Sequence, residues 1–218
     1  MSAYLEAGLH ESAMETYKTM IDDDHKPDTT ACNLLIRTFL EQGYQEGAFT
    51  VLRAMEKNKS HPDPDSYTYH TLVAHLTKEG DTQDLDEAYR VIERMEKKRK
   101  ESVYAYGPLI KALAEKGETE QAEGLIRTMN SRGIPTNVVV YNALLGAHAA
   151  RVGAEKDLAM VLHDMAENKV RPNPQTEMTV LRAYKERGAD AAPHAVETFD
   201  QMVELFATDE EEGGGGEK

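Results

Sequence analysis

The stretch VYAYGPLIKALAEKGETEQAEGLIRTMNSRGIPTN, at residues 103–137, carries two short apolar patterns separated by a glycine. In each pattern, apolar residues recur at i, i+3, i+4 and i+7, which places them on one face of a helix. They are Tyr106, Leu109, Ile110 and Leu113 in the first pattern, and Ala122, Leu125, Ile126 and Met129 in the second. Gly117 ends the first pattern, and Gly133 ends the second. The stretch therefore predicts a helical hairpin of 35 residues.

Neighbouring segments repeat this hairpin along the chain. Each second helix ends its apolar pattern on a methionine, and a small or apolar residue stands seven positions earlier. The methionines are Met20, Met55, Met95, Met129, Met165 and Met202. The steps between them are 35, 40, 34, 36 and 37 residues. A period of this size predicts an all-α array in which stacked hairpins share one elongated core.

Proline and glycine set the expected limits of the units. The predicted units are a partial unit at 1–28, complete units at 29–63, 66–102, 103–137 and 138–173, and a degraded unit at 174–208. The acidic, glycine-rich tail at 209–218 has the composition of a disordered segment. The first unit has only about half of a first helix, so we expect either a fragment of a longer array or a trimmed start.

Composition excludes several classes of protein. Cys32 is the single cysteine among 218 residues, so a disulfide framework is excluded and a reducing compartment is expected. No apolar run reaches the length of a transmembrane helix, and the first residues do not read as a targeting peptide. The net charge of −14 argues against indiscriminate binding to nucleic acid, because counterion release needs clustered Lys and Arg.

One basic run stands out against this acidic balance. It consists of Lys97, Lys98, Arg99 and Lys100, at the end of a predicted second helix. Cations at that end of a helix are favoured by the helix dipole, so a solvated helix terminus explains the run. A contact with phosphate or with an acidic protein is the alternative.

The units resemble pentatricopeptide repeats over about residues 1–206. The first-helix pattern of that family is matched by TTACNLLIRTF at 29–39, SYTYHTLVAHL at 66–76 and VVVYNALLGAH at 138–148. The Ala and Met pairs and the endings KPD, HPD and RPN match its second helix and closing loop. Tetratricopeptide repeats are the rival, but their first helix favours a tryptophan and this chain has none.

The resemblance implies a right-handed superhelix of about six helical hairpins with single-stranded RNA in its concave groove. Each repeat would read about one base through the fifth residue of its first helix and the last residue of the repeat. The implied base-reading pairs are Asn33 with Asp63, His70 with Ser102, Gly107 with Asn137, and Asn142 with Asn173. The first looks like a uridine-type pair and the last like a pyrimidine-type pair, while the middle two fit no strong combination. The implied base-stacking residues are Thr30, Tyr67, Tyr104 and Val139, although the two tyrosines could equally pack between hairpins.

Two functions remain open. The chain is either an RNA-binding protein acting in organellar RNA metabolism or translation, or a non-catalytic scaffold among the protein subunits of a larger organellar complex such as a ribosome. The resemblance implies a mitochondrion or chloroplast for both. The 8 histidines have no close metal-ligand spacing, and no phosphate-binding or nucleophile loop occurs. We therefore expect no catalytic residue, metal, cofactor, small-molecule substrate or membrane insertion.

Overall fold

The computed structural model describes most of the chain. The described residues are 4, 10–23, 25–57, 61–78, 82–100, 102–151, 155–185 and 192–207. The predicted tail at 209–218, and the predicted half-helix before residue 10 apart from Tyr4, lie outside these ranges.

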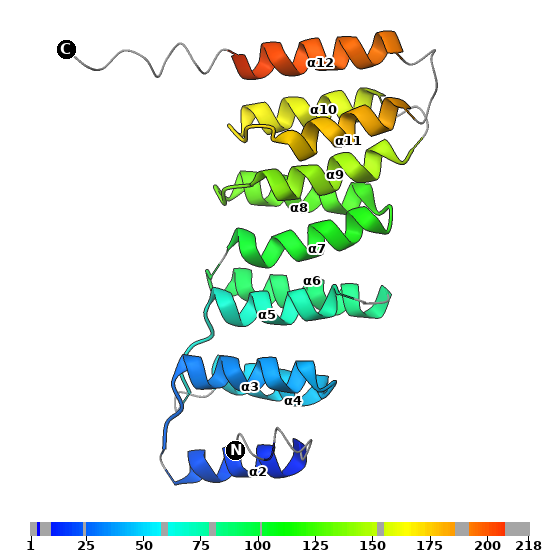
Figure 1. The fold of residues 1–218 in the computed structure, drawn as a ribbon. Coiled ribbons are helices and arrows are strands. Elements are labelled where there is room, and N and C mark those ends of the chain that lie inside the picture. The colour runs from blue at the N-terminus through cyan, green and yellow to red at the C-terminus, as the bar shows by residue number, and fades with distance from the viewer. Residues whose placement is uncertain are drawn as a thin grey trace, which may run out of the picture. The chain divides into compact units, whose positions relative to one another are not determined.

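Helices account for most of the described residues, and these ranges contain no strand (Figure 1). The helices are α2 (His10–Asp22), α3 (Thr29–Glu41), α4 (Gln45–Lys57), α5 (Ser66–Leu76), α6 (Thr82–Lys97), α7 (Val103–Glu115), α8 (Thr119–Ser131), α9 (Val138–Ala149), α10 (Glu155–Glu167), α11 (Pro174–Lys185) and α12 (Ala192–Ala207). The predicted all-α repeat fold is confirmed. None of these helices is both long and apolar enough to cross a membrane.

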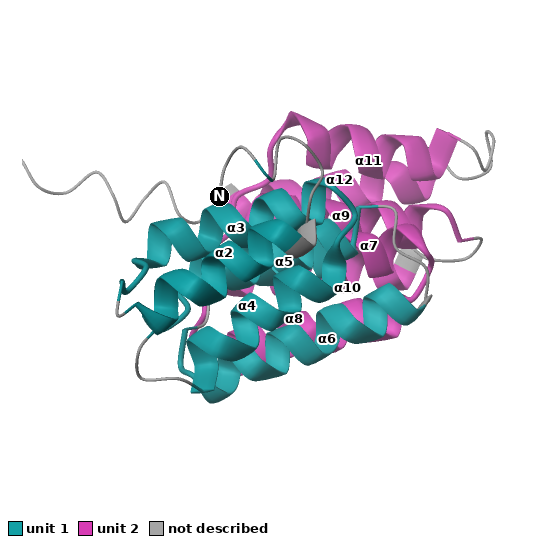
Figure 2. Cartoon of the chain, turned by 90° about the horizontal axis from the view of Figure 1, so that it is seen from below, with its two compact units in different colours: residues 1–109 teal, residues 110–218 magenta. Residues whose placement is uncertain are grey.

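The chain divides into two compact units, residues 1–109 and residues 110–218 (Figure 2). In the first unit, α3 packs against α4 and α5, and α5 packs against α6. In the second unit, α9 contacts α8, α10 and α11, while α12 contacts α10 and α11. First helices therefore pack both on their hairpin partners and on first helices of neighbouring repeats, as stacked hairpins require.

Glycines in the left-handed region form tight turns at the C-terminal ends of α3, α7 and α8. Gly43, Gly117 and Gly133 have φ values of 75°, 79° and 69°. After each glycine the next amide donates back to a carbonyl in the preceding helix, as Glu118 N does to Leu113 O at 2.9 Å. This closes the helix end in a Schellman arrangement, and glycine adopts the left-handed conformation without the backbone strain that a Cβ brings. The predicted helix stop at Gly117 is confirmed.

The repeated apolar stripes form the core of both units. Met55, Met95, Met129 and Met165 are almost wholly buried, as the methionine spacing predicted. Tyr69, Tyr106 and Tyr141 fill one equivalent slot in the first helices, and each is fully buried. The buried Cys32 occupies the same slot in α3, so its thiol belongs to the core. Burial raises the pKa of this thiol, which favours the neutral, unreactive form.

Candidate nucleic-acid interface

The residue before each first helix caps that helix. Asp28, Asp65 and Asn137 are the N-caps of α3, α5 and α9, and their side chains accept hydrogen bonds from backbone amides of the first turn. Asn173 accepts in the same way from Thr176 N at 3.0 Å, and Ser102 Oγ accepts from Tyr104 N at 3.3 Å. These side chains satisfy amides that have no partner within the helix, so their positions are fixed by the backbone.

Asn33 belongs to a polar triad that joins α3 to α5. Its Nδ2 donates to Asp65 Oδ1 at 3.2 Å, and its Oδ1 accepts from the Thr68 hydroxyl at 2.6 Å. Thr68 also donates its backbone N–H to Asp65 Oδ1 at 2.8 Å. Burial opposes ionisation of Asp65, but the hydrogen bonds from Thr68 and Asn33 outweigh it and lower the pKa of this carboxyl.

Asn33 contacts Asp65 and not Asp63, its predicted partner, so the structure does not bring the predicted pair together, and base reading by Asn33 with Asp63 stays a prediction. Asp63 is exposed and lies two residues before the helix cap, in the segment Pro62-Asp63-Pro64-Asp65. The two Pro-Asp steps look alike in sequence, but Asp65 alone directly precedes α5 and completes its capping box with Thr68. Asp65, and not Asp63, is therefore the residue that directly precedes the next first helix.

Asn142, Asn173 and Thr176 repeat the same triad in the second unit. Asn142 Nδ2 donates to Asn173 Oδ1 at 3.1 Å, and Thr176 Oγ1 donates to Asn142 Oδ1 at 2.7 Å. Each atom has its counterpart in the triad of Asn33, except that Asn173 replaces a carboxylate with an amide. The predicted Asn142 and Asn173 pair lies in direct contact, and its role in reading a base stays a prediction.

His70 occupies the equivalent position in α5 but bonds differently. In both triads the hydroxyl comes from the third residue of the next first helix. Here that residue is Ala105, which has no hydroxyl, and His70 Nδ1 instead lies 2.6 Å from Tyr104 O. A carbonyl oxygen only accepts, so Nδ1 carries the hydrogen and Nε2 of a neutral ring is an acceptor. Ser102 Oγ accepts from Tyr104 N, which leaves its O–H to donate. The two predicted residues thus offer one acceptor and one donor.

Gly107 and Asn137 are the weakest predicted pair. Gly107 lies inside α7 and has no side chain, while Asn137 Oδ1 accepts from Val139 N and Val140 N at 3.1 Å. The two residues belong to different compact units. Of this pair, only Asn137 has a side-chain contact, and that contact caps α9.

The four predicted stacking residues share one position, the second residue of a first helix, and all four are exposed. Tyr67 is 50% exposed, Tyr104 72% and Val139 61%, and Thr30 is exposed as well. The alternative that the tyrosines are packed between hairpins does not hold, since burial of that kind would cover their rings. The ring centroids of Tyr67 and His70 are 6.4 Å apart. Stacking on bases stays a prediction.

A cavity of about 510 Å³ is lined by first helices of the second unit, α7, α9 and α11. Its charged lining residues are Lys111, Glu115, Arg151 and Arg182. Asn142 of the second triad also lines it. The lining of this cavity therefore has more cations than carboxylates, although the net charge of the chain is −14. The sequence did not reveal this cavity, because its cations come from α7, from the turn after α9 and from α11, and they form no run.

The basic run closes the C-terminal end of α6. Lys97, Lys98, Arg99 and Lys100 are exposed, and Lys98 Nζ donates to the Glu56 carbonyl at 3.1 Å. Arg99 has a φ of 52°, so it takes the left-handed turn that glycine takes elsewhere. This environment is that of a solvated helix end. A phosphate contact of the run stays a prediction.

Comparisons with known proteins agree with this fold. The family model of the pentacotripeptide-repeat region of PRORP matches residues 10–193. Among curated proteins, no sequence matches the chain. Among solved structures, the repeat protein PPR10 from maize is similar with a TM-score of 0.61 and 20% identity, covering 97% of this chain and 33% of that one. This chain therefore spans about a third of that protein.

Two further structures contain RNA. The PPR domain of Arabidopsis thaliana protein-only RNase P 1 in complex with tRNA has a TM-score of 0.59 and 16% identity, covering 78% of this chain and 86% of that one. PPR10 in complex with an 18-nt psaJ RNA element has a TM-score of 0.55 and 18% identity, covering 100% of this chain and 33% of that one. At these identities the likeness establishes the fold.

Proposed function

Because the chain belongs to the pentatricopeptide-repeat family, we propose that its first helices bind single-stranded RNA in an organelle, a mitochondrion or chloroplast. The observation that carries this proposal is the polar triad found in both units. Asn33 and Asn142 are each held by a cap residue and a threonine hydroxyl. Amides and carboxylates fixed in this way match the hydrogen-bonding edges of unstacked bases.

Exposed side chains beside the triads support the same role. Tyr67 lies on the same helix as His70, and Tyr104 lies on the next first helix, where its carbonyl contacts His70. Both tyrosines are exposed, and stacking of a base on an aromatic ring contributes about 1–3 kcal/mol of binding free energy. The cavity with Lys111 and Arg182 offers cations for phosphates next to Asn142. Two related structures contain RNA, a tRNA in one and an 18-nt element in the other. The proposed activity is binding, with no catalytic step assigned to the repeats.

A salt series with pooled single-stranded RNA tests this function. Each phosphate contact should contribute about −0.7 to the slope of log K against log salt. Lys111→Gln should flatten the slope by about 0.7, whereas Lys156→Gln on α10, outside the cavity lining, should leave it unchanged. Absence of binding at low salt, or a slope that neither substitution changes, would contradict the proposal.

A further inference from the structure

A smaller cavity of about 260 Å³ lies between α8 and α10. We call it the α8–α10 groove, and it is lined by Glu123, Ile126, Arg127, Leu144, Asp157, Met160, Val161 and Asp164. Seven of these residues come from second helices, and one, Leu144, comes from α9. None of them lines the larger cavity that holds Lys111 and Arg182. The groove therefore needs an explanation apart from RNA binding.

The apolar part of the groove could hold an aliphatic chain. Ile126, Leu144 and Val161 are buried and form its base. Met160 is 70% exposed, so a large apolar side chain stands uncovered at the edge. Methionine is flexible and polarisable, and it adapts to a partner of variable shape. The buried side chains at the base and Met160 at the edge together form an apolar surface that can contact one aliphatic side chain.

The polar part of the groove is acidic. Its lining contains three carboxylates, those of Glu123, Asp157 and Asp164, and one guanidinium, that of Arg127. Arg127 Nη1 donates to Glu123 Oε2 at 3.3 Å, so this cation is already paired. Asp164 accepts from the Tyr141 hydroxyl at 2.8 Å and from Asn168 Nδ2 at 3.2 Å. Among the described residues, neither Asp157 nor Asp164 is paired with a lysine or arginine, so both carboxylates add negative charge to the rim. Such a rim repels phosphate and attracts a cation.

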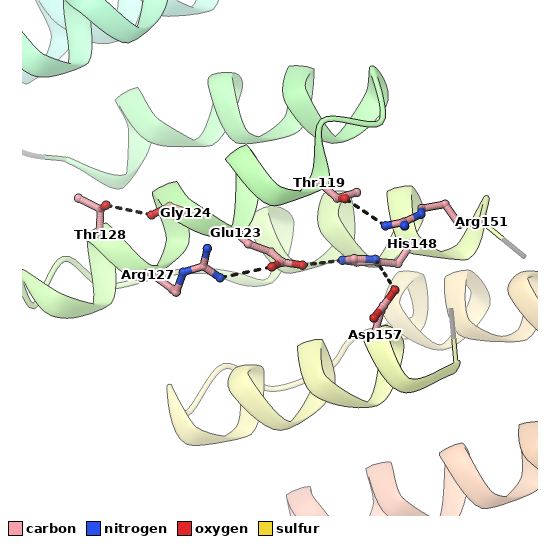
Figure 3. Close-up of polar contacts among 8 residues, drawn as sticks. All are labelled: Thr119, Glu123, Gly124, Arg127, Thr128, His148, Arg151 and Asp157. Carbon is pink, nitrogen blue, oxygen red and sulfur yellow. Dashed lines mark hydrogen bonds and ion pairs between the residues drawn. The ribbon is translucent and has the colours of Figure 1, made fainter. Parts of the chain in front are cut away.

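His148 supplies an independent observation beneath the rim. It is 2% exposed, with Nε2 2.9 Å from Glu123 Oε1 and Nδ1 3.5 Å from Asp157 Oδ2 (Figure 3). Among the described residues, Nδ1 is buried and has no hydrogen-bond partner. A carboxylate only accepts, so in a neutral ring Nε2 carries the hydrogen and Nδ1 turns a lone pair toward Asp157. In that neutral form two acceptors face each other, and a donor brought in beside them would satisfy both.

We propose that the α8–α10 groove binds an arginine side chain presented by a protein partner. A guanidinium carries five N–H donors and a permanent charge, so it can serve several acceptors at once. Its aliphatic stem lies on Leu144 and Met160 while its charge meets Asp157 and Asp164. Small-molecule pockets usually enclose about 300–1,000 Å³, so the 260 Å³ groove fits one long side chain better than a cofactor.

Methyl NMR on the full chain tests this site with N-acetyl-arginine amide as the probe. The Met160 and Ile126 methyl signals should shift and saturate with a dissociation constant of about 1 mM, which is the range for a ligand of this size. N-acetyl-citrulline amide has nearly the same shape without the charge, and it should leave both signals in place. Free arginine should bind no tighter than the capped form.

Two substitutions complete the test. Asp157→Asn removes one rim carboxylate from the partly exposed surface of α10, and it should weaken binding of the probe about tenfold. Glu167→Gln lies on the same helix outside the groove lining, and it should leave binding unchanged. Equal shifts with citrulline, no shifts with either probe, or wild-type affinity in Asp157→Asn would overturn the assignment. Tighter binding of free arginine would assign the groove to a metabolite, and shifts caused by an RNA oligonucleotide would assign it to nucleic acid; either would overturn it.

Discussion

His70 Nδ1 lies 2.6 Å from the carbonyl oxygen of Tyr104. In a regular helix that carbonyl would accept from the amide four residues later, which is Pro108. Proline has no N–H, so the Tyr104 carbonyl loses its partner within α7 and the histidine of the preceding repeat replaces it. A proline inside α7 therefore fixes the ring orientation of a candidate base-reading residue on α5.

Pro108→Ala tests this link. The substitution restores an N–H that competes with His70 for the Tyr104 carbonyl, and it removes a helix-interior proline. We expect the free energy of unfolding to rise by about 1–3 kcal/mol, while RNA affinity falls because His70 is released. Denaturant unfolding and fluorescence anisotropy with RNA would measure the two effects.

The matched control is Pro193→Ala in the first turn of α12. A first-turn amide has no acceptor within the helix, so this change should alter neither stability nor RNA affinity measurably. If Pro108→Ala gained stability and kept full RNA affinity, the orientation of His70 would not matter for binding.

Substitutions of His70 separate its two ring nitrogens. Asparagine places an amide donor near the position of Nδ1, whereas glutamine places a polar atom near that of Nε2. If Nε2 accepts from a base, His70→Asn should lose base preference at one position of a bound RNA, with up to tenfold weaker binding. His70→Gln should keep part of that preference. Anisotropy with RNAs varied at one base at a time measures this, and identical profiles for both variants would exclude reading through Nε2.

Thr68→Val removes the hydroxyl shared by Asn33 and Asp65. The valine methyl leaves Asn33 Oδ1 and the Asp65 amide without their partner. We expect a loss of about 1–3 kcal/mol in the free energy of unfolding, because these groups are partly or fully buried. RNA affinity should fall more than in Thr71→Val, since Thr71 bonds only within its own helix, to Tyr67 O. Equal RNA affinity in the two variants would show that the triad does not position Asn33 for binding.

The fold could be predicted because its determinants are local. Apolar spacing such as that of Leu109 and Leu113 fixes which helix face is buried, and Gly117 fixes where the helix stops. Both depend on residues within one or two turns, so each repeat predicts its own hairpin. The stacking of α3 on α5 then follows from the repetition of the stripe.

The candidate site was harder to predict, because it depends on contacts between repeats. Asn142 and Asn173, paired by position in the sequence, lie in contact, whereas Asn33 contacts Asp65 and not Asp63. The missing signal was the threonine three residues after the true cap, at Thr68 and Thr176. The contact of His70 with Tyr104 needed knowledge of two helices at once, although Pro108 gave a local hint.

Asp65 should make stability depend on acid pH. Hydrogen bonds hold its folded pKa below the usual value, so its contribution is present above the unfolded pKa, near about 4, and is lost as the pH falls through the folded pKa. The difference in unfolding free energy between wild type and Asp65→Asn should therefore be constant near neutrality and change below about pH 4. Urea unfolding across that range measures it. A difference that stays flat to the lowest pH would mean that the folded carboxyl titrates normally.

Gly117→Ala and Gly124→Ala should have opposite effects on stability. Gly117 has a φ of 79° and no atom within 4 Å of the Cβ it would gain, so the cost arises from backbone strain alone. Alanine in the left-handed region costs about 1–2 kcal/mol. Gly124 lies inside α8, where an added Cβ would meet only the end of Arg127 at 3.9 Å, so alanine should stabilise by about 0.5–1 kcal/mol. Chemical unfolding of both variants separates the two signs. If Gly117→Ala were neutral, the turn could close without the left-handed glycine, and the hairpin would not depend on its Schellman end.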